Sequence, residues 1–162
     1  MELFDAKKLE KIHKALVKRN QTIAVAESVT CGLLQLTLGQ AEFASEFYQG
    51  GITVYNIGQK YKHLQVEPIH AEAHNCVSEK VTAEMALHVC GLFNSDWGIG
   101  VTGYATPVPE SGNKIFAFYS IAYNKKIVAK GKLSPKKEPP FNLQLNYTKA
   151  IIDRLQKQLT KE

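Results

Sequence analysis

The segment at residues 22–38 reads TIAVAESVTCGLLQLTL, and it decides the fold. It begins with four apolar residues, 23–26, a run with the length of a buried strand. Small polar residues follow at 27–32, and leucines then recur with roughly helical spacing. The segment therefore predicts a strand over residues 22–26, a tight polar turn, and a helix over residues 30–38.

The small polar turn has two interpretations. Ser28 or Thr30 can cap the N-terminus of the helix, which is ordinary for these residue types. Alternatively, the Ser28 hydroxyl or the Cys31 thiol is a nucleophile, and unsatisfied N–H groups at the helix start stabilise a developing oxyanion. This segment alone favours capping.

The composition indicates one folded globular domain over residues 1–162. Apolar residues make up 44% of the chain and charged residues 22%, with no low-complexity tract. No apolar run has the length of a membrane span, and the N-terminus lacks the apolar stretch of a signal peptide. We therefore expect a cytoplasmic protein without membrane contact.

The net charge of +5 comes mainly from lysines in the last third of the chain. Arg19 and Arg154 are the only arginines, although arginine is the usual residue for bidentate recognition of phosphate and guanine. No recognition-helix or RNP-type motif is present. A solvated lysine face is the favoured interpretation, and nucleic-acid binding is not expected.

The cysteines and histidines do not predict a metal site. The three cysteines form no CxxC pair, and an odd number argues against a disulfide framework. His70 and His74 would share a helix face with Cys76 nearby, but no further cluster completes a site. Residues 70–74, HAEAH, also miss the zinc-protease spacing by one position.

The rest of the chain alternates helical and strand patterns. Helices are predicted over residues 5–19, 58–64, 69–73 and 143–159, with a further one capped by Ser78 and a short helical piece at 44–48. Strands are predicted over 52–55 and 97–102, followed by a hairpin of 115–123 with 127–133. This order favours a three-layer α/β/α sandwich with a mixed, mostly parallel sheet.

Small-residue turns follow three of the predicted strands, at residues 27–32, 55–60 and 102–107. Such strand ends converge on the ligand cleft of an open α/β sheet. If the first two strands are neighbours, Ser28 and Lys60 can approach each other. A lysine serves as a base when burial lowers its pKa toward neutrality. The competing interpretation is an exposed lysine on a short helix.

Five ordered motifs resemble the CinA C-terminal domain. They are Ala26-Glu27-Ser28-x-Thr30-x-Gly32, Gly50-Gly51-x-x-x-Tyr55, Lys60, Val77-Ser78 and Val101-Thr102-Gly103. The resemblance extends from about residue 9 to 123 and follows the family's order and spacing. Active members of that family are nicotinamide-nucleotide amidases.

The resemblance implies a three-layer α/β/α fold and a hydrolase that needs neither metal nor cofactor. The reaction would convert nicotinamide mononucleotide to nicotinate mononucleotide and ammonia. Ser28 would be the nucleophile and Lys60 its base, with Tyr55 beside them as a third catalytic residue. The small-molecule nucleotide would be bound by Glu27, Thr30, Cys31, Gly32, Gly50, Gly51, Thr102 and Gly103.

The resemblance also bears on assembly and domain content. It makes a homo-oligomer reasonable. Longer members carry an additional N-terminal domain of molybdopterin-binding type, so this chain is expected to be a stand-alone version.

The sequence departs from the family pattern at several positions. Cys31 replaces a glycine of the usual ESCTGG motif, Asn56-Ile57-Gly58 replaces Ser-Asn-Glu, and Tyr104 enters the loop after Gly103. The family's late Gly-Asp-Arg segment has no counterpart in residues 133–147, where Lys136 or Lys137, or Lys132 just before, could supply positive charge.

Two alternatives to the serine amidase follow from these departures. The first is a catalytically silent relative that binds a nucleotide or has a regulatory role. The second uses Cys31 as the nucleophile, because a thiol at a helix N-terminus can be reactive. A small free cysteine that simply fills space is the simpler interpretation of that residue.

Overall fold

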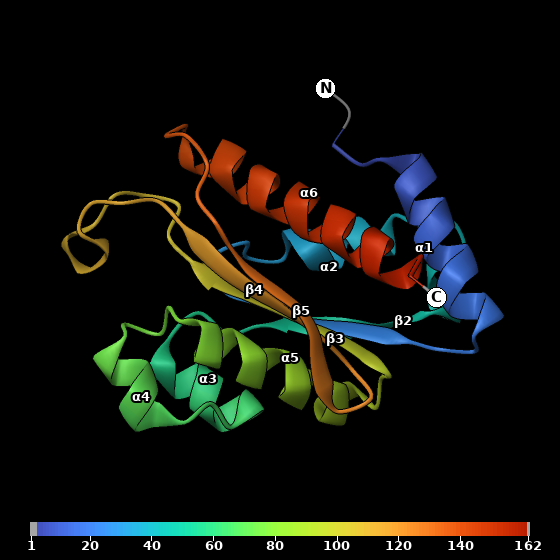
Figure 1. Cartoon of the computed structure of the whole chain (residues 1–162), viewed down its shortest axis with the longest axis horizontal. Coiled ribbons are helices and arrows are strands. Elements are labelled where there is room, and N and C mark those ends of the chain that lie inside the picture. Colours follow the sequence, from blue (N-terminus) through green and yellow to red (C-terminus); the bar gives the residue numbers. More distant parts are fainter. Residues whose placement is uncertain (1–2, 162) are drawn as a thin grey trace.

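The computed structural model of the chain describes residues 3–161 and contains one five-stranded sheet (Figure 1). The spatial order of the strands is β2-β1-β3-β4-β5. The strands are β1 (Ile23–Glu27), β2 (Tyr48–Thr53), β3 (Trp97–Gly103), β4 (Ala117–Tyr123) and β5 (Lys126–Leu133).

The sheet is mixed. β1 pairs in parallel with β2 on one side and with β3 on the other. β3 pairs antiparallel with β4, and β4 pairs antiparallel with β5, so only β4 runs against the others. The predicted mixed, mostly parallel sheet is therefore confirmed, and the first two predicted strands are neighbours.

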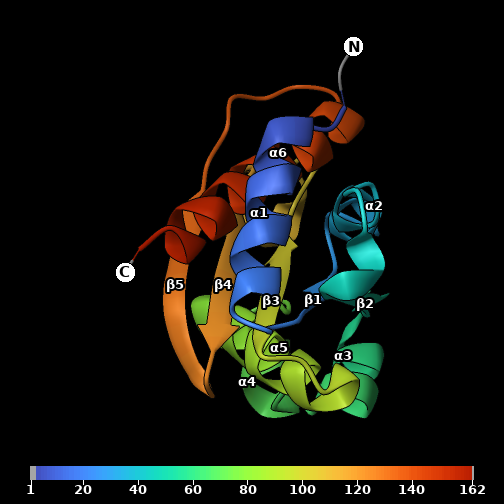
Figure 2. The same cartoon turned by 90° about the vertical axis from the view of Figure 1, so that its right-hand side faces the viewer.

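Helices cover both faces of the sheet (Figures 1 and 2). Helices α1, α2 and α6 lie on one face, and α3, α4 and α5 lie on the other (Figure 1). Their bounds are α1 (Ala6–Lys18), α2 (Leu33–Gly39), α3 (Ile57–Leu64), α4 (Pro68–Ala73), α5 (Glu79–Phe93) and α6 (Pro140–Leu159), with 3-10 turns at Ala44–Glu46 and Pro109–Ser111. The predicted three-layer α/β/α sandwich is confirmed. None of these helices is long and apolar enough to cross a membrane.

Alternation along β1 gives each face its own apolar core, because successive side chains of a strand point to opposite faces. Ile23 and Val25 belong to the core that includes the apolar residues of α1 and α6. Ala24 and Ala26 belong to the core beneath α5, together with residues such as Met85. Every residue of β1 is buried, which places its carboxyl end in the interior of the molecule.

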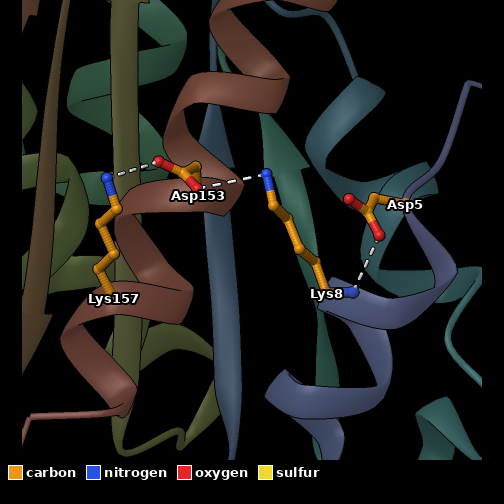
Figure 3. Close-up of polar contacts among 4 residues, drawn as sticks. All are labelled: Asp5, Lys8, Asp153 and Lys157. Carbon is orange, nitrogen blue, oxygen red and sulfur yellow. Dashed lines mark hydrogen bonds and ion pairs between the residues drawn. The ribbon is translucent and has the colours of Figure 1, made fainter.

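Charged side chains join α1 to α6 at the surface (Figure 3). Lys8 Nζ lies 3.2 Å from Asp153 Oδ1, and Lys157 Nζ lies 3.1 Å from Asp153 Oδ2. Asp5 caps α1, because its Oδ1 accepts a hydrogen bond from the Lys8 backbone N–H at 3.1 Å. Only the Lys8–Asp153 pair joins the two helices, and such partly exposed pairs contribute little stability individually.

Helix α5 packs closely on β3 because β3 carries glycines where the helix crosses it. A Cβ added at Gly98 would lie 2.2 Å from Ala86 O and 2.6 Å from Cys90 Sγ. Gly98→Ala is therefore expected to lower the free energy of unfolding by roughly 3 kcal/mol, since the helix must move to admit the methyl group. Urea denaturation measures the change.

Gly91→Ala is the matched control for that substitution. Gly91 lies in α5, and a Cβ added there meets nothing within 4 Å. Alanine favours a helix over glycine by roughly 1 kcal/mol, so this variant should be as stable as the parent or more stable. Equal denaturation midpoints for the two variants would contradict close packing of α5 on β3.

Two predicted boundaries next to the site are wrong, and the C-terminal helix begins at Pro140 instead of at residue 143. Helix α2 begins at Leu33 and not at residue 30, because Cys31 and Gly32 have φ of +51° and +100°, outside the helical region. The predicted strand at residues 52–55 is displaced, since pairing with β1 draws Tyr48–Thr53 into β2 and leaves Tyr55 beyond its end.

Candidate active site

The carboxyl ends of three neighbouring parallel strands meet at one edge of the sheet. Ser28 follows β1, Val54 follows β2, and Thr102 and Gly103 end β3. Lys60 lies on α3, which begins three residues after Val54. The strand order thus brings together the three turns that the sequence predicts to converge.

Ser28 and Lys60 are in direct contact. Lys60 Nζ lies 2.9 Å from Ser28 Oγ and donates a second hydrogen bond of 2.9 Å to the Val54 carbonyl oxygen. The Lys60 side chain is only 1% exposed and Ser28 only 7%. Helix α3 holds this orientation from its first turn, where the Asn56 side chain accepts from the Gln59 N–H. The interpretation of Lys60 as an exposed lysine is wrong.

The surroundings of Lys60 disfavour its charged form. Burial lowers the pKa of Lys60 from its ordinary value of 10.5 to about 8, and nearby Cys76 opposes that shift slightly. Burial also raises the pKa of the Cys76 thiol, with Lys60 as a smaller opposing influence. A lysine with a pKa near 8 is partly neutral at physiological pH, as a general base must be.

Glu27 caps helix α2 from inside the protein. Its Oε1 accepts hydrogen bonds from Thr30 Oγ1 at 2.5 Å and from the Leu34 N–H at 2.8 Å. Its Oε2 accepts from the Gln35 N–H and from Gln35 Nε2, both at 3.0 Å. A carboxylate at this position also interacts favourably with the helix dipole.

The capping interpretation of Ser28 and Thr30 is therefore wrong. The N-cap residue of α2 is Gly32, which has no side chain to cap the helix, and the Glu27 carboxylate takes that role. The Thr30 hydroxyl is directed at Glu27 instead of at the helix. The Ser28 hydroxyl faces Lys60.

The turn leaves backbone donors next to Ser28. Within residues 3–161, the backbone hydrogen bonds of this turn include one from the Cys31 N–H to the Ser28 carbonyl oxygen at 3.1 Å and one from the Leu33 N–H to the Thr30 carbonyl oxygen at 3.0 Å. The N–H groups of Val29, Thr30 and Gly32 take part in none of them. Cys31 is exposed and has a left-handed φ of +51°, which glycine adopts at lower cost.

The end of β3 forms another wall of the site. Thr102 is buried and its hydroxyl donates to the Cys76 carbonyl oxygen at 2.9 Å, which ties β3 to the loop before α5. A Cβ added at Gly103 would lie 2.5 Å from Ala117 Cα, so this position packs against β4. Tyr104 follows, with its ring against Phe116 at 5.3 Å between centroids.

The remaining predicted residues form no recorded side-chain contact with the Ser28–Lys60 pair among residues 3–161. Tyr55 follows Val54 in sequence, but its side chain is 71% exposed. Gly50 and Gly51 lie within β2, where their missing side chains make room for Phe93 and Gln35. A catalytic role of Tyr55 and a substrate-binding role of Gly50 and Gly51 stay predictions.

Residues that the sequence analysis did not single out hold the loops of the site. From α6, Gln144 Nε2 donates to the Val29 carbonyl oxygen at 2.9 Å, and Tyr147 OH donates to the Tyr104 carbonyl oxygen at 2.7 Å. Gln35 links Glu27 to Thr53 of β2. These are long-range contacts of common polar residues, so no local pattern in the sequence could have identified them.

The histidines considered for a metal have other partners. The rings of His70 and His74 are stacked with centroids 4.0 Å apart, and His70 Nε2 lies 2.8 Å from Ser78 Oγ. Within residues 3–161 no group of three His, Cys, Asp or Glu side chains is arranged to hold a metal ion.

An open cavity of about 520 Å³ lies further along the same edge of the sheet, where β4 begins and β5 ends. Lys114, Lys132 and Lys137 line it, and no acidic residue of the described part of the chain does. Lys132 Nζ lies 4.4 Å from the centroid of the Phe116 ring, a cation–π contact that holds the ammonium in place. Among the described residues, none of the three lysines forms an ion pair.

Comparison with solved structures shows the same fold in known bacterial proteins. A competence-damaged protein (CinA) superfamily protein from Enterobacter cloacae matches with a TM-score of 0.90 and 23% identity, covering 96% of this chain and 92% of that one. One from Klebsiella pneumoniae 700603 matches with a TM-score of 0.89 and 22% identity, covering 98% of both chains.

Sequence comparison identifies the family. A CinA-like protein of Prochlorococcus marinus is 40% identical over 99 residues, which are 61% of this chain and 23% of that protein. The chain thus spans about a quarter of the length of such curated relatives. The family model of the CinA C-terminal domain matches residues 5–137. This chain belongs to the CinA C-terminal domain family.

Proposed function

We propose that the protein is an amidohydrolase that uses Ser28 as nucleophile and Lys60 as general base. The observation that carries the proposal is the contact of 2.9 Å between Lys60 Nζ and Ser28 Oγ, deep at the carboxyl edge of the sheet. A serine becomes nucleophilic when a positioned base accepts its proton. A buried lysine with a pKa of about 8 meets that requirement.

In the proposed reaction, the neutral Lys60 amine accepts the Ser28 proton as Oγ attacks the amide carbonyl carbon. The Val54 carbonyl oxygen accepts one N–H of Lys60 and so keeps the nitrogen lone pair directed at Ser28. Backbone N–H groups of the turn at Val29, Thr30 and Gly32 are the candidate donors to the resulting oxyanion.

Collapse of the tetrahedral intermediate breaks the C–N bond. Lys60 returns its proton to the departing nitrogen, which leaves as ammonia. Water then attacks the acyl-serine ester with Lys60 again as the base, and the carboxylate product leaves. Ser28 and Lys60 thus carry out both acylation and deacylation by covalent catalysis and proton transfer.

The substrate class is an amide on an anionic nucleotide, with nicotinamide mononucleotide as the family resemblance suggests. The cavity with three lysines supports an anionic substrate. Neighbouring strands lie about 4.8 Å apart, so β4 and β5 are roughly 10 and 14 Å from β1. A mononucleotide with its amide at Ser28 would extend from β1 toward these strands, and its phosphate is expected on the side of the lysines.

The deciding experiment follows ammonia release from nicotinamide mononucleotide. The parent and Cys31→Ala should both release ammonia, whereas Ser28→Ala should be at least about 10³-fold slower, because it lacks the attacking oxygen. Nicotinamide riboside, which lacks the phosphate, should react more slowly with the parent. Release by Ser28→Ala at the parental rate, or loss of activity in Cys31→Ala alone, would overturn the serine mechanism.

A second candidate is a nucleotide-binding or regulatory module without catalysis. It is favoured by the burial of Ser28 and by the hydroxyls of Thr30 and Thr102, which are directed at protein acceptors. This candidate predicts that calorimetry detects binding of nicotinamide mononucleotide while the parent releases no ammonia.

A further inference from the structure

Gln35 connects the two halves of the Ser28–Lys60 pair. Its Nε2 lies 3.0 Å from Glu27 Oε2 and 3.0 Å from Thr53 Oγ1. Glu27 directly precedes Ser28, and Thr53 directly precedes Val54, whose carbonyl oxygen accepts from Lys60. One amide group on α2 therefore joins the turn that holds the serine to the strand end that holds the lysine.

Contacts on both sides of the Gln35 side chain hold it in one position. A Cβ added at Gly51 would lie 2.6 Å from Gln35 Cγ, so the glutamine side chain lies directly over this glycine of β2. The Gln35 backbone N–H also donates to Glu27 Oε2 at 3.0 Å. The side chain is thus fixed by its own helix at one end and by β2 at the other.

Strand β2 is also held to β1 by backbone contacts at this end, since the Val54 N–H donates to the Glu27 carbonyl oxygen at 2.8 Å. It is an edge strand that pairs only with β1, and it contains two consecutive glycines, Gly50 and Gly51. The link through Gln35 adds a side-chain restraint to this backbone pairing, and without it the position of the Val54 carbonyl relative to Ser28 is less restricted.

We infer that Gln35 is a positioning residue that sets the separation of Ser28 and Lys60 by tying β2 to the Glu27 carboxylate. This inference rests on the proposed function in its consequence for catalysis. Its structural consequence, the environment of Lys60, is independent of any substrate. A displacement of about 1 Å between reacting groups can cost roughly 10²-fold in rate.

The test replaces Gln35 with methionine, which has similar length but cannot donate hydrogen bonds. Gln35→Met should lower kcat by roughly 10- to 100-fold with little change in KM, because the substitution disturbs the geometry of Ser28 and Lys60 and leaves the substrate-binding contacts intact. The Lys60 pKa, followed by NMR of its labelled side chain, should rise from about 8 toward 10.5 as water reaches the amine. The pH at which kcat/KM levels off should rise with it.

Two further variants separate positioning from general destabilisation. Gln49→Met places the same substitution at an exposed position of β2 and should change neither kcat nor the Lys60 pKa. Thr53→Val removes the other partner of the link, so its effect and that of Gln35→Met should not add in the double variant.

The outcomes distinguish this inference from the proposed function. If the parent releases no ammonia, the amidase proposal fails, but a raised Lys60 pKa in Gln35→Met still supports the positioning role. If Gln35→Met retains the parental Lys60 pKa, the inference is wrong whatever the activity. Reduced thermal stability with an unchanged Lys60 pKa would likewise assign Gln35 a purely structural role and overturn the inference.

Discussion

Replacing Lys60 with methionine is expected to lower kcat/KM for amide hydrolysis by about 10³-fold or more. The variant keeps a side chain of similar volume in the buried position but removes the base that accepts the Ser28 proton. Loss of one member of a nucleophile–base unit typically costs 10⁴- to 10⁶-fold in kcat. Ammonia release at saturating and limiting substrate measures the change.

The pH dependence provides the second part of this prediction. Only neutral Lys60 is a base, so log kcat/KM of the parent should rise by one unit per pH unit below about pH 8 and level off above it. Lys60→Arg should not restore activity, since a guanidinium stays protonated throughout this range.

Lys62→Met is the matched control for these measurements. Lys62 lies on the same helix but is exposed, so this variant should keep the parental rate and pH profile. Parental activity in Lys60→Met, or a pH profile of the parent that falls between pH 6 and 8, would exclude Lys60 as the general base.

The same K60M substitution is expected to change stability with a distinctive pH dependence. Well below pH 8 Lys60 is mostly charged in both the folded and the unfolded protein, and the folded protein bears nearly the full cost of burying the ammonium. A shift of the pKa from 10.5 to about 8 corresponds to roughly 3 kcal/mol. The K60M variant avoids this cost, but it loses the two hydrogen bonds of Lys60, which together contribute roughly 2 kcal/mol to the stability of the parent.

The sign of the effect therefore changes with pH. Between pH 8 and 10.5 the unfolded parent binds more protons than the folded parent, so parental stability rises with pH in that window. The K60M variant should be about 1 kcal/mol more stable than the parent at pH 7 and roughly 2 kcal/mol less stable above pH 10.5. Urea denaturation of both proteins across this range measures the difference, and a pH-independent difference would contradict the buried cationic lysine.

Much of this fold could be predicted from the sequence because its signals are local. The apolar run of β1, the Ser78 cap of α5 and the periodicity of α1 each specify an element from neighbouring residues. The approach of Ser28 to Lys60 was also predictable, since it follows once β1 and β2 are adjacent.

Other features could not be predicted because they depend on contacts between distant segments. Glu27 reads as a polar residue at the end of a strand, and only the folded turn shows that its carboxylate caps α2. The late start of α2 follows from the left-handed backbone at Cys31 and Gly32, which the small polar run did not specify. Gln35 is an ordinary helix residue until Gly51 is brought beneath it.

The contacts of α6 with the site have a consequence for how the domain is delimited. The family match ends at residue 137, and α6 begins at Pro140. Yet Gln144 and Tyr147 hold the Val29 and Tyr104 carbonyls, one in each of the two loops that flank the Ser28–Lys60 pair. A fragment trimmed to the matched residues would retain every proposed catalytic group but lose the two hydrogen bonds from α6 that hold these loops in position. The part of the chain that supports the site is therefore longer than residues 5–137, which the family model matches. Engineered or shortened versions of the domain should retain α6.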